Sequence, residues 1–155
     1  GDMIDQVSME KTTYAKPPLR FEAGTPPIAS AIALKEALEF MQSYGHQEMI
    51  AHETKLYLQA KEGLKTIPGI RFLGNTPDQG PILTFVMEGI HPLDLATMLD
   101  LQDISVRSGH LCAQPLLRAF GLESAIRASF AIYNTEEEVD RFVSEVNRLA
   151  AALRK

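Results

Sequence analysis

The sequence has a single cysteine, no long apolar run and no cluster of basic residues. One cysteine cannot form an internal disulfide, which indicates a reducing compartment such as the cytoplasm. No apolar run approaches the roughly 20 residues of a membrane span, and the first residues lack the basic and apolar regions of a signal peptide. We therefore expect a soluble, cytoplasmic protein without a membrane partner.

The charge balance argues against a nucleic-acid partner. The 15 basic residues are scattered and are outnumbered by 20 acidic ones, which gives a net charge of −5. A surface that binds nucleic acid needs clustered positive charge. With 155 residues, 45% of them hydrophobic, the chain is long enough to bury a real core.

Hydrophobic periodicity predicts helices over residues 28–44, 46–66, 91–101 and from Thr135 onward. Thr25 can cap the first of these, with Pro26 in its first turn and an apolar face at Ile28, Ile32, Leu38 and Met41. Thr135 and Glu138 form a capping box for the last helix. Its apolar face is Val139, Phe142, Val143, Val146, Leu149 and Leu153.

Strands are predicted over residues 70–73, 82–87, 104–107 and 125–132, and residues 3–9 could form another. Residues 12–18 are polar, end in two prolines and read as irregular chain. This order of elements predicts an α/β (α+β) fold with two layers, in which helices pack on a small mixed sheet.

Residues 107–115 contain the cysteine and read Arg-Ser-Gly-His-Leu-Cys-Ala-Gln-Pro. They have no clear helical or strand period, which predicts a loop that presents its side chains. A thiol is reactive as thiolate, and Arg107 and His110 lie within five positions of Cys112. A lone cysteine can also be a small buried hydrophobe, but the polar setting of Ser108 and Gln114 favours a functional thiol.

Three segments together resemble one family: residues 20–26, residues 107–115 and residues 127–135. They look like the C-terminal part of a Suf-type (group II) cysteine desulfurase, a fold-type I, class V aminotransferase-like pyridoxal-phosphate enzyme. The resemblance covers essentially the whole chain. It implies an enzyme that takes sulfur from L-cysteine as a cysteine persulfide, leaves alanine and passes the sulfur to an acceptor protein of the Suf system for iron–sulfur cluster assembly.

The resemblance assigns roles to individual positions. Cys112 matches the sulfur-accepting cysteine, and Arg127 matches the arginine that binds the substrate carboxylate, a task that suits a planar guanidinium. Arg107 matches a second arginine near the substrate. Thr25 matches a threonine that contacts the cofactor phosphate across a homodimer. Arg127 could instead point to solvent, and Thr25 could be only a helix cap.

His110 is interpreted as a catalytic residue that shapes the loop or handles a proton, since a zinc site would need more ligands than Cys112 and His110 provide. Leu111 departs from the family, which often has a second histidine there. The family's cofactor lysine also has no counterpart here. The resemblance thus implies a fragment, with residues 1–27 as the tail of the large cofactor domain and 28–155 as the C-terminal small domain. We expect this fragment alone to bind no pyridoxal phosphate and to be inactive.

Two other functions remain open from the sequence. The chain could be a non-catalytic module that docks a sulfur-acceptor protein. It could also be a hydrolase that uses Cys112 and His110, but a base two positions away is poorly placed and no orienting acid is evident.

Overall fold

The computed structural model describes residues 2–74, 76 and 79–154. The chain divides into two units, Gly1–His46 and Gln47–Lys155. Every buried hydrophobic residue of the described chain lies in the second unit. No helix in the described part of the chain is long and apolar enough to cross a membrane.

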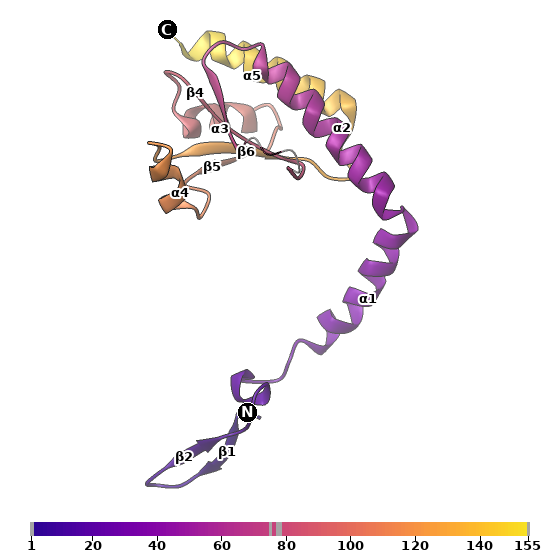
Figure 1. The fold of residues 1–155 in the computed structure, drawn as a ribbon, viewed down its shortest axis with the longest axis vertical. Helices are drawn as coiled ribbons and strands as arrows, with labels where there is room; N and C mark the ends of the chain where they lie inside the picture. The colour runs from indigo at the N-terminus through magenta and orange to yellow at the C-terminus, as the bar shows by residue number, and fades with distance from the viewer. Residues whose placement is uncertain (1, 75, 77–78, 155) are drawn as a thin grey trace. The chain divides into compact units, whose positions relative to one another are not determined.

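The second unit is built on a four-stranded sheet (Figure 1). Its strands are β3 (Ile70–Leu73), β4 (Ile82–Met87), β5 (Arg107–Gly109) and β6 (Ala125–Ser129), in the order β3-β4-β6-β5. The predicted mixed sheet is wrong, because all three strand pairs are antiparallel. Helix α3 (Pro92–Asp100) joins β4 to β5, which run in the same direction, but β6 lies between them.

Helices α2 (His46–Lys65) and α5 (Glu136–Leu153) cover one face of this sheet. Leu56 and Leu64 from α2 and Val146 and Leu149 from α5 are fully buried against the strands, together with Leu95 and Leu99 from α3. The predicted two-layer α/β (α+β) fold is confirmed by this arrangement.

The two long helices approach each other closely at Gly63. A Cβ atom placed on Gly63 would lie 2.8 Å from Cγ1 of Val143. Real Cβ atoms essentially never come this close to another heavy atom. The glycine therefore allows α2 to pack directly on α5, at the cost of a weaker helix former.

Helix α5 begins as the sequence predicts. Thr135 Oγ1 accepts a hydrogen bond from the Glu138 backbone N–H at 3.2 Å, and Glu138 Oε2 accepts one from the Thr135 N–H at 3.0 Å. This is the predicted capping box. Most of its predicted apolar face is buried, and Val143 and Leu153 pack at the margin of the core.

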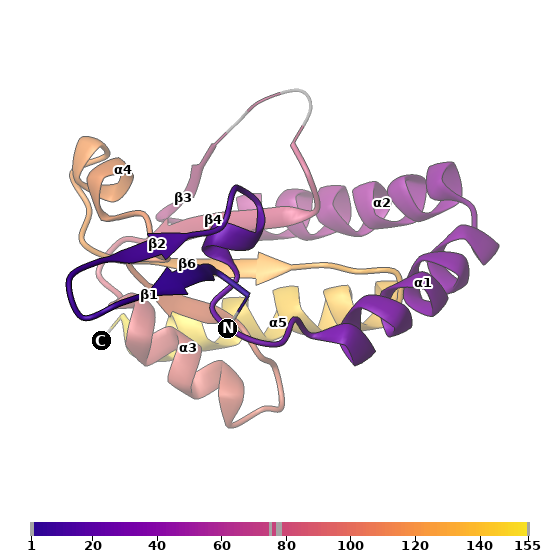
Figure 2. The ribbon, with the colours of Figure 1, turned by 90° about the horizontal axis from the view of Figure 1, so that it is seen from below.

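The first unit begins with a hairpin of β1 (Ile4–Val7) and β2 (Thr12–Tyr14), followed by the short helix η1 (Leu19–Phe21) (Figure 2). The prediction of irregular chain over residues 12–18 is wrong for β2. Backbone pairing with β1 orders this polar segment, and such pairing cannot be predicted from the composition of the segment.

Helix α1 (Ile28–Ser43) completes the first unit, but Thr25 does not cap it. A Thr25 cap would accept a hydrogen bond from the N–H of residue 27 or 28. Pro27 has no N–H, and Ile28 donates to the Pro26 carbonyl at 2.8 Å instead. The predicted cap is therefore wrong, although the helix itself is confirmed.

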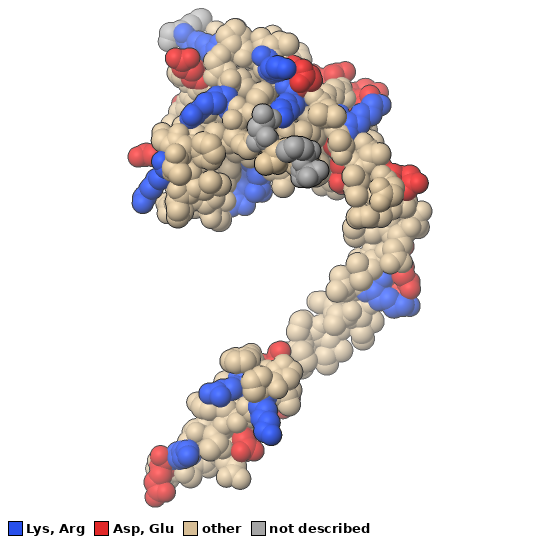
Figure 3. Space-filling view, viewed as in Figure 1, with Lys and Arg blue, Asp and Glu red and all other residues tan. Residues whose placement is uncertain are grey.

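No residue of α1 is buried, and on the face that Figure 3 shows much of its surface is uncharged. The predicted apolar face is exposed, at 47–68% of each residue's surface. The interpretation of residues 1–27 and 28–155 as parts of two domains stays a prediction.

Candidate functional site

Strands β5 and β6 place two arginines directly opposite each other. Arg107 pairs with Arg127, and Arg127 pairs on its other side with Thr84 of β4. The neighbours Ile126 and Ala128 belong to the core beneath α2 and α5, so Arg127 projects from the opposite face of the sheet. Directly paired residues share a face, which puts Arg107 there as well.

The predicted strand over residues 104–107 begins three positions later, at Arg107. Because β5 continues to Gly109 and helix α4 (Gln114–Ala119) starts at Gln114, the predicted loop shrinks to residues 110–113. The first three residues of the predicted loop, 107–109, are ordered as a strand by pairing with β6. The strand predicted over 125–132 also ends early, at Ser129.

Cys112 is exposed on this short loop. Nη2 of Arg107 donates a hydrogen bond to Sγ of Cys112 at 3.2 Å. The Sγ atom is thus exposed to solvent and in contact with a positively charged side chain. The alternative in which the cysteine is a small buried hydrophobe is therefore wrong.

His110 contacts the backbone of the loop rather than the thiol. Its Nδ1 accepts a hydrogen bond from the Cys112 N–H at 3.0 Å, and its carbonyl accepts one from the Ala113 N–H at 2.9 Å. An accepting Nδ1 carries no proton, so the ring proton is on Nε2. These contacts fit the loop-shaping role among the two that the sequence left open for His110.

The Arg127 side chain has no hydrogen bond or ion pair among the described residues, and its Nε is buried. A buried donor without a partner is costly, and two guanidinium groups directly across a strand pair repel each other. An anion that accepted from Arg127 would offset both costs. The Nε of Arg127 is buried although the residue as a whole is half-buried, and the assignment of Arg127 to a ligand stays a prediction.

Thr84 was not singled out from the sequence. The signal for it is the alternation of residues 82–87, in which a polar residue sits between the buried Leu83 and Phe85. Its position opposite Arg127 is set by the pairing of β4 with β6, which alternation within one strand does not predict.

The described lysines of the second unit lie away from the face of the sheet that carries Cys112. A Schiff base needs a lysine. Lys55, Lys61 and Lys65 all lie on α2, which covers the face of the sheet opposite Cys112. Lys155 lies outside the described residues. Within the described chain there is also no group of His, Cys, Asp or Glu that could hold a metal ion.

Thr25 lies in the first unit and is exposed. Its hydroxyl takes part in no hydrogen bond among the described residues, since the predicted cap does not form. The hydroxyl thus has no structural task within this unit.

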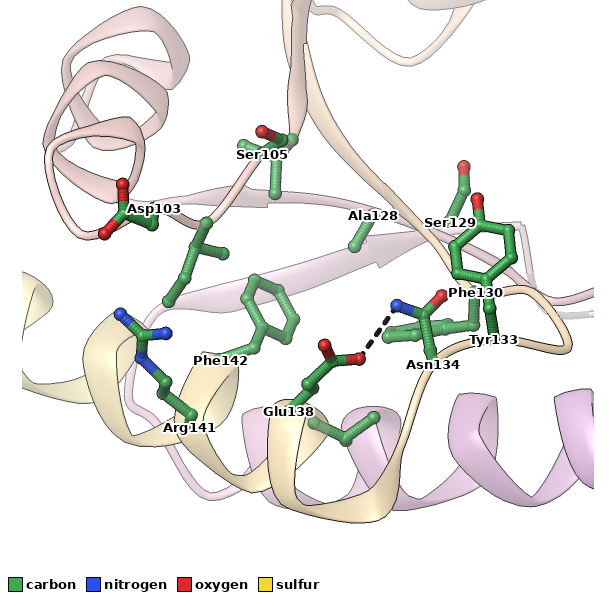
Figure 4. A pocket seen from close by; sticks show the side chains of 13 residues that line it. Asp103, Ser105, Ala128, Ser129, Phe130, Tyr133, Asn134, Glu138, Arg141 and Phe142 are labelled. Atoms are coloured by element: carbon green, nitrogen blue, oxygen red, sulfur yellow. Dashed lines mark hydrogen bonds between the residues drawn. The ribbon is translucent and has the colours of Figure 1, made fainter.

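A pocket of about 340 Å³ lies beside the start of β5 and is separate from the thiol (Figure 4). Val106, Phe130 and Phe142 form its apolar wall, and Asn134 donates a hydrogen bond to Glu138 at its rim. Arg107, Cys112 and Arg127 do not line it.

Comparison with known proteins finds one family model and many relatives. The model described as aminotransferase class-V matches residues 1–142. A probable cysteine desulfurase of Mycobacterium leprae is 45% identical over 97% of this chain, and a cysteine desulfurase of Synechococcus elongatus is 44% identical over 96%. The chain spans 24% of the length of each of these two relatives.

Similar solved structures are also cysteine desulfurases. The apo cysteine desulfurase of Thermococcus onnurineus has a TM-score of 0.85 and 35% identity, and the cysteine desulfurase CsdA (S-sulfonic acid) of Escherichia coli has a TM-score of 0.84 and 36% identity. Each match covers 99% of this chain and 38% of the other.

Proposed function

The chain belongs to the aminotransferase class-V family, and on that basis we propose that it is the part of a cysteine desulfurase that presents the sulfur-accepting thiol. The relatives named cysteine desulfurase support this activity for the whole protein. We assign it to the Suf-type group because the segments around Cys112 and Arg127 resemble that group.

The observation that carries the proposal is the contact between Arg107 and Cys112. An exposed thiol 3.2 Å from a guanidinium nitrogen is poised to act as a nucleophile. A merely structural cysteine would need neither the exposure nor the cation.

The two arginines would act on different ends of the same substrate. Arg127 would bind the carboxylate of L-cysteine, which supplies the acceptor that its buried Nε lacks. Arg107 would hold Sγ of Cys112 beside the substrate sulfur. Because both arginines lie on one face of adjacent strands, a small amino acid can reach both.

The sulfur-transfer step balances without an added oxidant. The Cys112 thiolate forms a bond to the substrate sulfur as the bond from that sulfur to the substrate Cβ breaks. The carbon keeps the electron pair and takes up a proton, so the substrate leaves as alanine and Cys112 becomes a persulfide. Pyridoxal phosphate, bound in the whole enzyme, would make this cleavage possible.

The remaining parts of the proposal come from the resemblance. The whole enzyme would be a cytoplasmic homodimer, with Thr25 at the cofactor phosphate of the other subunit. A sulfur-acceptor protein of the Suf system would receive the persulfide sulfur for iron–sulfur cluster assembly. The exposed position of Cys112 supports a transfer to a second protein.

The proposal is tested in the whole protein that contains this chain, loaded with cofactor. Incubation with L-cysteine should yield alanine and add one sulfur atom to the peptide that contains Cys112, as seen by mass spectrometry. Cys112→Ser should abolish the added sulfur. Alanine formation by this variant at the unchanged rate, or sulfur on another peptide, would remove Cys112 from the reaction. A complete lack of alanine from the unsubstituted protein would favour the docking module.

The chain of 155 residues provides a second test. Mixed with pyridoxal phosphate and L-cysteine, it should release no more sulfide than its Cys112→Ala variant, because the resemblance assigns no lysine of this chain to the cofactor. Alkylation should nevertheless modify Cys112 in the native chain. A thiol that reacts only after unfolding would contradict its exposed position.

A further inference from the structure

The backbone around Cys112 adopts an unfavourable conformation. Leu111 has φ of +54° and Cys112 has φ of +57°, and both are residues with a Cβ atom. Gly109 also has a positive φ, of +110°, but glycine tolerates it. Two successive left-handed residues persist only where the surrounding contacts fix them.

His110 supplies one of these contacts. The hydrogen bond from the Cys112 N–H to its Nδ1 closes a ring between a side chain and the backbone two residues further on. Asparagine and aspartate side chains commonly make the same kind of closure in turns. The ring nitrogen that faces the loop is therefore occupied by the amide and is not available to take a proton from the thiol.

Leu111 supplies the other contact. Its side chain packs against an apolar cluster made of Leu73 from β3, Leu117 from α4 and Ala125 from β6. This cluster lies on the same face of the sheet as Cys112, because Ala125 and Arg127 alternate with the core residue Ile126. Leu111 thus ties the loop to three elements of the unit.

We propose that His110 and Leu111 are positioning residues, which together hold Cys112 in its left-handed conformation so that Sγ stays against Arg107. This inference rests on the proposed function only for the role of Cys112 as sulfur acceptor. His110 acts through the backbone amide of Cys112, and Leu111 acts through its apolar contacts.

The position of Sγ against Arg107 is tested by the rate at which iodoacetamide alkylates Cys112 in the native chain near neutral pH. His110→Ala and Leu111→Ala should each slow alkylation by about threefold or more, the lower end of the coupling seen between neighbouring residues. His110→Asn should keep the rate of the unsubstituted chain, because its side-chain oxygen can accept from the Cys112 N–H but cannot titrate. Leu111→Met should also keep it, since methionine retains the apolar contact.

The Arg107→Gln background separates positioning from a general loss of structure. In that background the Ala substitutions at 110 and 111 should have no further effect on the rate, because the contact they maintain is already gone. Leu116→Ala, at an exposed position of α4, serves as the matched control and should alter nothing.

Two outcomes would overturn the inference. A His110→Asn variant as slow as His110→Ala would show that the titratable ring, and not its accepting atom, matters. If the Ala substitutions at 110 and 111 slowed alkylation equally with and without Arg107, they would act by destabilising the fold. Neither outcome depends on sulfur transfer, so a failure here is distinct from a failure of the desulfurase proposal.

Discussion

At the scale of single residues, the site depends on positive charge that the unit does not neutralise. Arg107 and Arg127 face each other across β5 and β6, and the Nε of Arg127 has no hydrogen-bond partner among the described residues. A fold selected only for stability would avoid this pair. The proposed binding of a substrate carboxylate would explain the arrangement.

Replacing Arg127 by lysine should weaken the use of L-cysteine far more than it weakens cofactor binding in the whole enzyme. Lysine keeps the charge but loses the planar, two-pronged geometry. The loss of one charge-assisted hydrogen bond, about 1.5–3 kcal/mol, raises KM roughly tenfold or more. Steady-state kinetics with Arg148→Lys as control, an exchange on the surface of α5, checks this. An unchanged KM would remove Arg127 from the substrate site.

A second residue-scale feature is the carboxylate at the start of α5. The side chain of Asn134 and the backbone N–H of Thr135 both donate to Glu138, which lowers the pKa of this carboxyl below its usual range. A folded-state pKa below the unfolded one means that the stabilisation is fully present above the unfolded pKa. It is lost as the pH falls through the folded pKa.

Glu138→Gln should therefore cost stability at neutral pH and cost progressively less below about pH 4, where the unfolded carboxyl takes up its proton. Urea unfolding of both proteins between acid and neutral pH measures the difference. Glu145→Gln, which alters a carboxyl outside the capping box, controls for the change in net charge. A difference between wild type and Glu138→Gln that is constant over this range would refute the carboxylate's role.

At the scale of elements, the packing of α2 on α5 depends on the missing side chain of Gly63. Two effects oppose each other there. Alanine is the better helix former by about 0.5–1 kcal/mol, but overpacking costs about 1–3 kcal/mol. Val143 is β-branched and stiff at χ1, so it cannot easily move away.

Gly63→Ala alone should accordingly destabilise the chain by about 1 kcal/mol or more, because the clash exceeds the gain in helix propensity. The same substitution in a Val143→Ala background should be neutral or stabilising, since the clashing methyl groups are absent. Denaturant unfolding of the four proteins of this cycle gives both values. Equal effects of Gly63→Ala in the two backgrounds would mean that the helices do not meet at this point.

At the scale of the whole molecule, burial is unequal between the two units. The hydrophobic core belongs to Gln47–Lys155, whereas β1, β2, η1 and α1 bury none of their residues. Helix α1 carries Leu34, Leu38, Phe40 and Met41 on an exposed surface. Segments with few buried contacts open at low free-energy cost.

Limited proteolysis should therefore cut within residues 2–46 before it cuts the second unit. A resistant product that begins near Gln47 and retains α5 is expected, and mass spectrometry identifies its ends. Leu149→Ala, which removes a fully buried side chain at a cost of about 2–5 kcal/mol, should make that product sensitive as well. Early removal of α5 would contradict this distribution of stability.

The sequence alone determined the features that depend on neighbours along the chain. The helices, the capping box at Thr135 and Glu138, and the strands over residues 70–73 and 82–87 follow from periodicity and turn residues within one segment. The resemblance likewise indicated Cys112, Arg107 and Arg127, because it depends on residue order.

Tertiary structure decided what depends on pairing between distant segments. The antiparallel sheet, the start of β5 at Arg107 and the pairing of residues 12–14 in a hairpin are set by hydrogen bonds to other strands. Thr25 does not cap α1, because Pro27 has no N–H that could donate to its hydroxyl. The contact of Arg107 with Cys112 and the anchoring of Leu111 exist only because sheet register and loop closure bring these side chains together, and no local pattern encodes that distance.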